Sequence, residues 1–455
     1  MPVSSVDTIS VIVPAGVLGG GVSVELMSAG LKAGAVAVAV DAGSTDSGPS
    51  CLATGVSKVS RDAVKRDLKS ILTVAIPAGL PILVGSCGTS GTDMGVDWTF
   101  EILKEVAQEL AMNPRVALLY CEQDTTRLVQ DLVDNRIQPL APAGPLRVEE
   151  ISDCDHIVAL MGPEPYIWAL EQGAQIILGG RTTDTAVLAA IPLMRGMDPA
   201  HSWHGAKVAE CGGLCTVNPR GGGVLLTLGQ DFFEVRPLAE DNFCTPETVS
   251  AHMLYENSDP FTLTEPGGVL DVSESVYRQQ DDKTVRVTGS RWNVKPYTMK
   301  LEGASSGPFQ TIMLIGIQDP KVLADIPLFL ERMHKRLADI VETTFPGLDG
   351  WNISLRPYGW NAVSDRPPPQ WYTPLEIGLL MVVTASSQEL ATRIAKALNS
   401  TYFHFPLQPN IPLPTYAFPF SPAEIERGQV YEFRLNHVVE TDDPMDRVRF
   451  AFHDL

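Results

Sequence analysis

Acidic, hydroxyl and glycine residues follow directly on a short apolar run near the start of the chain. The run 35–40 reads AVAVAV and ends in Asp41. The loop after it carries a second carboxylate together with hydroxyls and glycine: Gly43, Ser44, Thr45 and Asp46. An apolar run bounded by a turn is typical of a buried strand, and open α/β sheets bind ligands beyond the carboxyl ends of their strands. This stretch therefore predicts a site with acid–base groups.

The same pattern returns after further apolar runs. Polar loops follow residues 80–84, 115–120, 156–161 and 175–178, and each run is expected to form a strand of the same sheet. Because the carboxyl ends of parallel strands share one edge of a sheet, we expect five candidate catalytic residues to line one cleft: Asp41, Asp46, Asp93, Glu122 and Asp184. Asp124 and Glu164 occupy similar loops and join the expected cleft.

Carboxylates held close together raise one another's pKa and suit general acid–base catalysis. They also bind hard cations, so Asp41, Asp46 and Asp93 are candidate ligands of Mg²⁺ or Ca²⁺. Nothing in the sequence requires such a cofactor. A second interpretation stays open, in which Asp41, Asp93 and Asp184 are helix caps or turn formers, roles that aspartate fills well.

Arg181, in the segment GGRTTDTA, is the candidate for binding a substrate carboxylate, because its guanidinium group matches that anion with two parallel hydrogen bonds. An ion pair with Asp184 is the alternative. Two glycine loops, Gly16–Gly21 and Gly85–Gly91, would present backbone N–H groups to a developing oxyanion. The remaining substrate-binding candidates are Gly19, Gly20, Ser44, Thr45, Ser86, Thr89, Ser90 and Thr182.

Cys211 offers a nucleophile of a different kind. His204 and Glu210 precede it and Cys215 follows, but the second ligand pair that a zinc finger needs is missing from the sequence. A Cys211 thiol near His204 would suit hydrolysis or acyl transfer; an unreactive local thiol is the alternative. Further along the chain, three charged residues stand beside glycines and could reach the cleft: Glu265, Lys300 and Glu302.

Repeated strand–loop–helix units position these loops. Short all-apolar strands alternate with amphipathic helices such as 61–76 over residues 1–200. This order predicts an α/β fold with a doubly wound, mostly parallel sheet. A β-rich region is expected over 201–308, with a strand at 297–301. The β-α-β-β-α-β order of 309–455, beginning with a strand at 310–317, predicts a ferredoxin-like α+β domain with a proline-rich C-terminal arm.

The composition limits the partners. Fifty-four acidic and 34 basic residues give a formal charge of −20, which argues against nucleic acid and anionic membranes, since both attract basic surfaces. No signal peptide or membrane span is evident. Seven cysteines, an odd number, are expected as free thiols in the cytoplasm. The tracts 365–374 and 405–422 are rich in proline, and the β-rich region together with the second tract suggests a homo-oligomer; the expected partner is a small-molecule substrate.

Several motifs, in their order along the chain, resemble the AtuA-like family, the acyclic terpene utilisation family. They are DAGSTDSGP, VKRDLK, GSCGTSGTD followed by DWTFEI, GGRTTDTA, HGAKVAECG, LYENSDPF, EPGGVLD and PYTMKLEGA. The resemblance runs from about residue 8 to residue 440. It implies a cytoplasmic catabolic protein in a pathway of acyl-CoA intermediates. It brings no catalytic residues with it, so the candidate site rests on the residues themselves.

The leading hypothesis is a catabolic enzyme that acts on a small carboxylic acid or its acyl-CoA thioester by acid–base addition–elimination, as a hydratase, lyase or isomerase does. Two alternatives stay open. One is a hydrolase or acyl transferase that uses Cys211 or a loop serine as its nucleophile. The other is a non-enzymatic accessory subunit of an acyl-CoA pathway.

Overall fold

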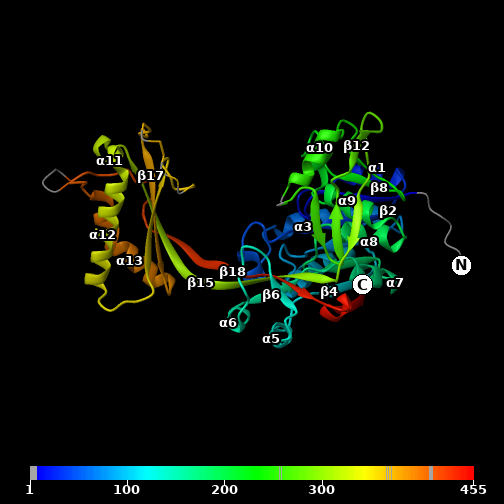
Figure 1. Ribbon diagram of the computed structural model, residues 1–455, viewed down its shortest axis with the longest axis horizontal. Coiled ribbons are helices and arrows are strands. Elements are labelled where there is room, and N and C mark those ends of the chain that lie inside the picture. The colour runs from blue at the N-terminus through cyan, green and yellow to red at the C-terminus, as the bar shows by residue number, and fades with distance from the viewer. Residues whose placement is uncertain are drawn as a thin grey trace. The chain divides into compact units, whose positions relative to one another are not determined.

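The computed structural model describes residues 8–255, 257, 259–364, 366, 368–369, 371–408 and 413–455. The chain divides into two compact units (Figure 1). Unit 1 comprises the chain up to Ser305 together with Glu432–Leu455, and unit 2 is Ser306–Tyr431. The predicted boundaries at residues 200 and 308 stay a prediction.

A ten-stranded mixed sheet forms the centre of unit 1. Its five central strands are parallel and stand in the order β1 (Ile9–Val13), β2 (Ala35–Asp41), β3 (Ile82–Gly85), β7 (Ile176–Gly179) and β4 (Arg115–Tyr120). Antiparallel strands extend both edges: β8 (Val224–Leu228), β9 (Phe233–Pro237), β13 (Val285–Thr288) and β12 (Val276–Gln279) beyond β1, and β19 (Arg449–Asp454) beyond β4. The register places Asp41 beside Gly85 at the carboxyl ends of β2 and β3.

Helices cover both faces of this sheet. One face packs against α1 (Val24–Lys32), α3 (Arg61–Ala75) and α4 (Asp93–Leu110), whose apolar residues share one buried core with the strands. Helices α7 (Glu164–Glu171), α8 (Ala186–Met194) and α9 (Pro199–Ala209) contact the strands but contribute nothing to that core, as expected for helices on the opposite face. The predicted α/β class with its doubly wound, mostly parallel centre is confirmed.

Shorter elements complete unit 1. They are α2 (Ser50–Thr54), α5 (Thr125–Val133), β5 (Ile137–Pro139), α6 (Val148–Ser152), η1 (Gly212–Cys215), α10 (Pro246–Ala251), η2 (His252–Leu254) and η3 (Pro444–Arg447). A separate three-stranded sheet has the order β10 (Thr262–Glu265), β11 (Gly268–Asp271) and β14 (Arg291–Val294). Strands β8 to β14 supply the β-rich region that the sequence predicts after residue 200.

One predicted strand lies in a different sheet from the one expected. β6 (His156–Ala159) forms as predicted, but it pairs antiparallel with β15 (Thr298–Ile317), with Ala159 beside Leu301. The parallel sheet has no room for it, because β7 stands between β3 and β4. The segments 297–301 and 310–317, which the sequence suggests as two strands, both fall largely within the single strand β15.

Unit 2 has its own helices and part of a six-stranded sheet, which also includes β5 and β6 of unit 1 and whose strands β15 and β18 (Ile425–Glu440) belong to both units. The strands of unit 2 stand in the order β16 (Asn352–Tyr358), β17 (Ile377–Ala385), β15 and β18. Helix α12 (Ile326–Thr344) follows β15, and α13 (Gln388–His404) follows β17; a short α11 (Pro320–Ala324) precedes α12. Both long helices lie beside β17 in Figure 1 and share a buried core with it. This order confirms the ferredoxin-like pattern.

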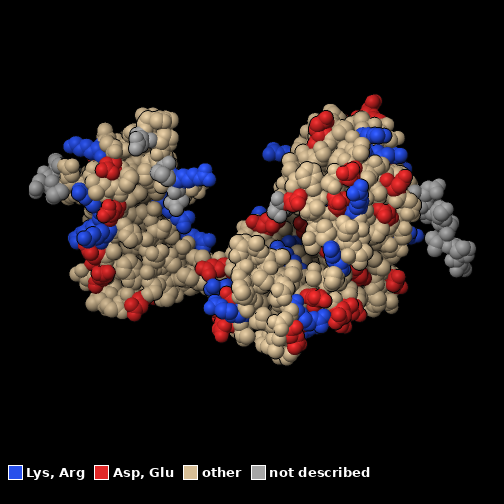
Figure 2. Space-filling model, in the orientation of Figure 1, with Lys and Arg blue, Asp and Glu red and all other residues tan. Residues whose placement is uncertain are grey.

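Part of each proline-rich tract lies outside the described residues, namely Asp365, Pro367 and Gln370 in the first and residues 409–412 in the second. Acidic and basic side chains are interspersed over the faces of both units that Figure 2 shows. None of the described helices is long and apolar enough to cross a membrane.

Candidate functional site

Two cavities in unit 1 share Asp184. The first cavity has a volume of about 820 Å³ and the second about 410 Å³. Carboxylates, glycine backbone and exposed cations line the first: Gly16, Gly20, Asp41, Gly43, Ser44, Asp46, Lys58, Asp184, Cys211 and Arg220 are among its residues. The second is lined by charged side chains and hydroxyls, including Arg181, Thr183, Thr185, Lys207, Glu210, Glu265 and Lys300. The candidate site is centred on Asp184, which lines both cavities.

Asp41 ends β2 and lines the first cavity. Its carboxylate is buried, with Oδ2 accepting a hydrogen bond from the Gly43 N–H (3.1 Å). Oδ1 has no hydrogen-bond partner among the residues that the structure describes. Burial and the nearby Asp184 raise the pKa of Asp41 well above its ordinary value, and the positive charge of Arg181 offsets only part of that rise. Such a carboxyl holds a proton at a pH where an exposed aspartate has lost it.

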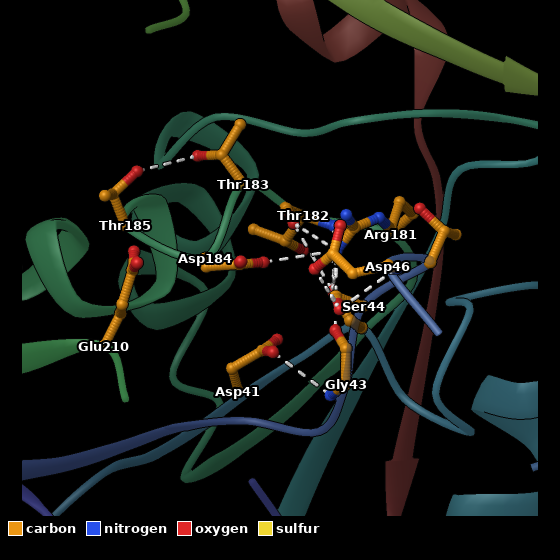
Figure 3. Close-up of polar contacts among 12 residues, drawn as sticks. Asp41, Gly43, Ser44, Asp46, Arg181, Thr182, Thr183, Asp184, Thr185 and Glu210 are labelled. Carbon is orange, nitrogen blue, oxygen red and sulfur yellow. Dashed lines mark hydrogen bonds and ion pairs between the residues drawn. The ribbon is translucent and has the colours of Figure 1, made fainter. Parts of the chain in front are cut away.

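Arg181 follows β7 and joins three segments of the site. Its Nη1 donates to Asp184 Oδ1 (3.2 Å) and Ser86 Oγ (3.1 Å), and its Nε donates to Glu302 Oε2 (3.1 Å). Figure 3 shows the Asp184 carboxylate turned toward this guanidinium group and Asp41 turned toward Gly43. Arg181 is buried, so its charge acts on these partners with little screening by water.

Glu302 comes from β15 and balances the charge of Arg181. Lys300 Nζ also donates to its Oε1 (2.8 Å). Burial alone would raise the pKa of Glu302, but Arg181 and Lys300 together lower it to about 2. Glu302 therefore stays ionised, and Arg181 has a permanent anionic partner. This contact also brings β15 to the site, as the sequence suggested for Lys300 and Glu302.

The loop after β2 makes its hydrogen bonds within the protein. Ser44 Oγ donates to Asp46 Oδ2 (2.5 Å), and Thr45 Oγ1 donates to Glu302 Oε2 (3.0 Å). Gly43 has a φ of +146°, and a Cβ at this position would lie 2.6 Å from the Cα of Thr89. Only glycine lets the loops after β2 and β3 approach so closely.

The glycine loop after β1 binds an internal carboxylate. Asp67 Oδ2 accepts from the N–H groups of Gly19 (2.8 Å) and Gly21 (2.9 Å), and Asp67 Oδ1 accepts from Val22 (3.1 Å). Gly20 N–H donates to Val17 O (2.9 Å). The loop is thus an anion cradle of the expected kind, but Asp67 of α3 fills it. Sequence reasoning missed Asp67, although an acid in phase with Val64, Leu68 and Ile71 on a helix is a detectable signal.

The predicted hydroxyls after β3 and β7 are buried and bonded to neighbouring loops. Ser86 Oγ accepts from Arg181, Thr89 Oγ1 accepts from the Lys58 N–H (3.0 Å), and Ser90 Oγ donates to Cys51 O (3.0 Å). Thr182 Oγ1 lies 2.7 Å from the hydroxyl of Tyr166. Among these four, only Thr89 lines the first cavity.

Asp93 and Glu122 form a second cluster that lines neither cavity. Asp93 begins α4 and pairs with Arg449 of β19. Glu122 Oε1 lies 2.7 Å from His156 Nδ1, and this contact raises the pKa of His156. The structure therefore brings together Asp41, Asp46 and Asp184 but places Asp93 and Glu122 elsewhere. Glu164 likewise lines neither cavity and accepts from the Tyr297 hydroxyl (2.6 Å).

The second cavity contains a buried ion pair and a perturbed carboxyl. Lys207 Nζ donates to Glu210 Oε1 (2.5 Å), and both side chains are almost inaccessible to solvent. Burial raises the pKa of Glu265 to about 7, with Thr185 and Lys207 acting in the opposite direction. A carboxyl with a pKa near neutrality is suited to proton transfer in either direction. Glu265 is one of the three later residues that the sequence suggested for the cleft.

Cys211 lies in the wall of the first cavity, but His204 does not accompany it. The His204 ring is buried between Ser290 Oγ (2.8 Å) and the Tyr277 hydroxyl (3.0 Å), and burial lowers its pKa to about 3. Instead, His252 approaches Cys211. One group of potential metal ligands is found among the described residues, and it consists of Glu210, Cys211 and His252.

Two cationic side chains stand at the first cavity without acidic partners. Lys58 and Arg220 both line it and are exposed. Neither makes an ion pair with any residue in the described part of the chain. Together with Arg181 and Lys207, which line the second cavity, they provide positive charge near the carboxylates that an anionic ligand could use.

Comparison of the sequence with protein-family models agrees with the resemblance that the sequence motifs indicated. The family model described as acyclic terpene utilisation family protein AtuA matches residues 64–216 and 235–409. The chain belongs to the AtuA family. Membership implies a catabolic role, and the matched residues include Asp67, Arg181, Asp184 and Glu210. This AtuA-family protein has no significant match among curated proteins, and none among solved structures.

Proposed function

We propose that this AtuA-family protein is a catabolic enzyme that transfers a proton to or from a carbon of a small carboxylic acid or its acyl-CoA thioester. The reaction is an addition–elimination or an isomerisation. The observation that carries the proposal is Asp41, a buried carboxyl that lines a cavity of about 820 Å³ and has one oxygen without a partner among the described residues. None of the seven cysteines forms a disulfide in the described part of the chain, which agrees with a reducing compartment such as the cytoplasm.

The acid and the base in this proposal are Asp41 and Asp184. Two neighbouring carboxyls do not ionise equally, because each charge opposes the other. Burial raises the pKa of both residues, but Asp184 is paired directly with Arg181 and is partly exposed, whereas Asp41 is fully buried. We therefore assign Asp41 as the protonated general acid and Asp184 as the ionised general base.

The cations divide into two roles. Arg181 already makes hydrogen bonds to Asp184, Ser86 and Glu302, so in this proposal it orients Asp184. Lys58 and Arg220 have no acidic partner among the described residues and are the groups that would bind the substrate's carboxylate or the phosphates of CoA. Exposed long side chains with free charges suit a ligand that enters from solvent.

Hydrogen–deuterium exchange into a substrate carbon tests the proposal. The full chain is incubated in D₂O with a panel of saturated, unsaturated and hydroxylated carboxylates and their CoA thioesters, and each compound is followed by proton NMR. Addition–elimination and isomerisation both break a C–H bond, so a true substrate should gain deuterium beside its carbonyl group. Thioester hydrolysis would release CoA without that exchange.

The exchange reaction should depend on the two acids. Asp41→Asn and Asp184→Asn should each slow it by about 10²-fold or more, the usual contribution of a positioned general acid or base. Asp62→Asn, an exposed change on α3, is the matched control and should leave the rate unchanged. Folded Asp41→Asn and Asp184→Asn proteins with the wild-type exchange rate would refute the assignment.

A thiol-dependent hydrolase is the second candidate function, and Cys211 carries it. Cys211 lines the first cavity, and its Sγ lies within 4.8 Å of a ring nitrogen of His252. A cysteine beside a histidine can attack a thioester carbonyl. Release of CoA without deuterium exchange, abolished by Cys211→Ser, would favour this function. Ligand binding that survives Asp41→Asn, with no turnover at all, would favour an accessory subunit.

A further inference from the structure

Three side chains of different chemistry meet in the wall between the two cavities. Glu210 and Cys211 follow α9, and His252 begins η2 after α10. One carboxylate oxygen, the sulfur and one ring nitrogen all lie within 4.8 Å of one another. Cys211 also lines the first cavity, and Glu210 also lines the second. Sequence spacing cannot reveal this group, because His252 stands 41 positions after Cys211 (252 − 211).

Two of the three residues have a buried polar atom without a partner. Glu210 is 2% exposed and His252 is 5% exposed. Glu210 Oε2 and His252 Nε2 make no hydrogen bond to any atom in the described part of the chain. The other oxygen of Glu210, Oε1, is held by Lys207 at 2.5 Å, so the free oxygen is fixed in position. A buried polar atom without a partner is unfavourable, and a bound ion or water is a common way in which proteins satisfy it.

The backbone around Cys211 is also fixed. A Cβ on Gly16 would lie 2.6 Å from the carbonyl oxygen of Cys211, and a Cβ on Gly212, which has a φ of +57°, would lie 2.7 Å from Gly16 N. The loop after β1 therefore packs directly on the backbone of this segment. Helix α10, which leads into His252, packs against η1. The candidate ligands come from segments held by tight contacts.

We propose that Glu210 Oε2, Cys211 Sγ and His252 Nε2 bind one divalent transition-metal ion of the zinc class. Carboxylate, thiolate and imidazole are ligands that zinc accepts together, and three protein ligands leave one position for water or substrate. A tetrahedral ion about 2.0–2.3 Å from each ligand sets the ligand atoms roughly 3.3–3.8 Å apart. The three ligand atoms lie within 4.8 Å of one another, so a small movement of the side chains toward one another would reach this geometry.

This site differs from the predicted Mg²⁺ or Ca²⁺ site at Asp41, Asp46 and Asp93. Those ligands are all oxygens, which suit hard cations, and Asp93 does not line the cavity that contains the other two. Sulfur and nitrogen ligands select softer metals. The inference is independent of the proposed acid–base reaction, because none of the three ligands is assigned to that reaction and the test below requires no turnover.

Cobalt(II) binding tests the proposal on the full chain. The protein is treated with a chelator, dialysed and titrated with Co²⁺, which replaces Zn²⁺ and absorbs visible light. We expect one Co²⁺ per chain, a thiolate-to-cobalt charge-transfer band, and loss of that band when Zn²⁺ is added. Bound metal should also raise the melting temperature of the protein, since the ion binds the folded state.

Ligand variants locate the metal. His252→Ala, Glu210→Gln and Cys211→Ser should each weaken binding by at least about 100-fold, because loss of even an outer-shell partner costs about 10–100-fold. Cys154→Ser is the matched control for the thiol and His156→Gln for the imidazole; both residues are half-buried and lie outside the group. The controls should keep wild-type stoichiometry and spectrum.

Three results would overturn the proposal. One is wild-type protein that binds no Co²⁺. Another is bound Co²⁺ without a sulfur charge-transfer band, and the third is unchanged binding in folded His252→Ala. If the variants do not fold, as judged by circular dichroism, the wild-type spectrum still decides. A cobalt spectrum that persists in Glu210→Gln but disappears in Cys154→Ser would place the metal at another thiol and also overturn the proposal.

Discussion

Asp41 links activity and stability at the scale of one residue. Its pKa in the folded chain is raised above the ordinary value near 3.8, so the folded state binds the extra proton over the interval between the two values. The free energy of unfolding therefore falls as the pH rises through that interval. The ionised form is the one that this buried position tolerates poorly.

Asp41→Asn should remove this pH dependence. We expect the variant to be more stable than the wild type at pH 7.5, because asparagine cannot ionise at a position that tolerates a negative charge poorly, while it loses the proposed activity. At pH 4 the two proteins should be nearly equal. Urea unfolding at a series of pH values measures the difference. Parallel curves for the two proteins across the whole range would contradict this account of Asp41.

Asp67 should matter for stability more than its place in the middle of a helix suggests. Asp67→Ala leaves the N–H groups of Gly19, Gly21 and Val22 without their acceptor. We expect a loss of about 3 kcal/mol, because each buried donor left unpaired costs roughly 1–3 kcal/mol and part of the loop can rehydrate. Asp62→Ala on the same helix is the control and should change stability by less than about 0.5 kcal/mol. Chemical denaturation compares the two variants.

Whether the other predicted residues lie in the site depends on long-range contacts, and the spacing of residues in the sequence does not reveal these. Asp41, Asp46 and Asp184 lie together because neighbouring strand ends share one sheet edge, which the pattern of apolar runs does indicate. Asp93 lies outside the two cavities and pairs with Arg449, which belongs to the last strand of the chain. His252 gave no signal, since a single histidine with no other potential ligand beside it in the sequence has many structural roles. The catalytic assignments themselves stay predictions.

At the scale of elements, the site depends on close approach between loops at the ends of β2, β3 and β7. Gly43 stands against Thr89, and Gly91 stands against Arg181, where a Cβ would lie 2.1 Å from the backbone nitrogen. Both glycines have positive φ. These contacts fix where Asp41 and Asp184 lie relative to each other, although neither glycine takes part in any chemistry.

A pair of glycine variants separates close packing from backbone strain. Gly43 and Gly48 are in the same loop and have φ values of +146° and +114°, but only Gly43 has neighbours that a Cβ would strike. Gly43→Ala should lower the melting temperature and weaken binding of any ligand found for the first cavity. Gly48→Ala should show only the smaller cost of strain, about 1 kcal/mol. Equal effects of the two changes would contradict the proposed contact between loops.

The order of elements was largely readable from local patterns, and the assignment of strands to sheets was not. Apolar runs, glycine turns and amphipathic helices predict β2, β3, β4 and β7 with their helices, and the structure confirms the α/β class. β6 has the same kind of sequence but pairs with β15. The length of β15 could not be predicted either. Glycines and a proline at 303–308 interrupt the apolar pattern, but the strand continues through them.

At the scale of the whole molecule, the two units contain separate cores. The buried cluster of unit 2 draws only on residues between Met313 and Ala423, and every residue that lines the two cavities belongs to unit 1. The ferredoxin-like order of unit 2 was predictable because its six elements follow one another without interruption. The return of the chain to unit 1 was not, since it depends on pairing of β18 with β5.

Differential scanning calorimetry should resolve two transitions in the full chain. A ligand or metal bound in the cavities should raise only the transition of unit 1, because binding stabilises the unit that holds it. The segment 306–431 expressed alone should show the other transition at nearly the same temperature. A single transition with equal calorimetric and van't Hoff enthalpies would show that the two units unfold as one.

The chain leaves unit 1 on β15 and comes back on β18, and these are neighbouring antiparallel strands. Arg434 Nε donates to Ser305 Oγ (2.8 Å), so the points of departure and return are side by side. Unit 2 is therefore an insertion at the tip of a hairpin. Joining Ser305 to Glu432 through a short turn that contains Asn-Gly would restore an ordinary hairpin. The remaining protein should keep the melting transition of unit 1, and the same position would accept a foreign domain whose own ends lie close together.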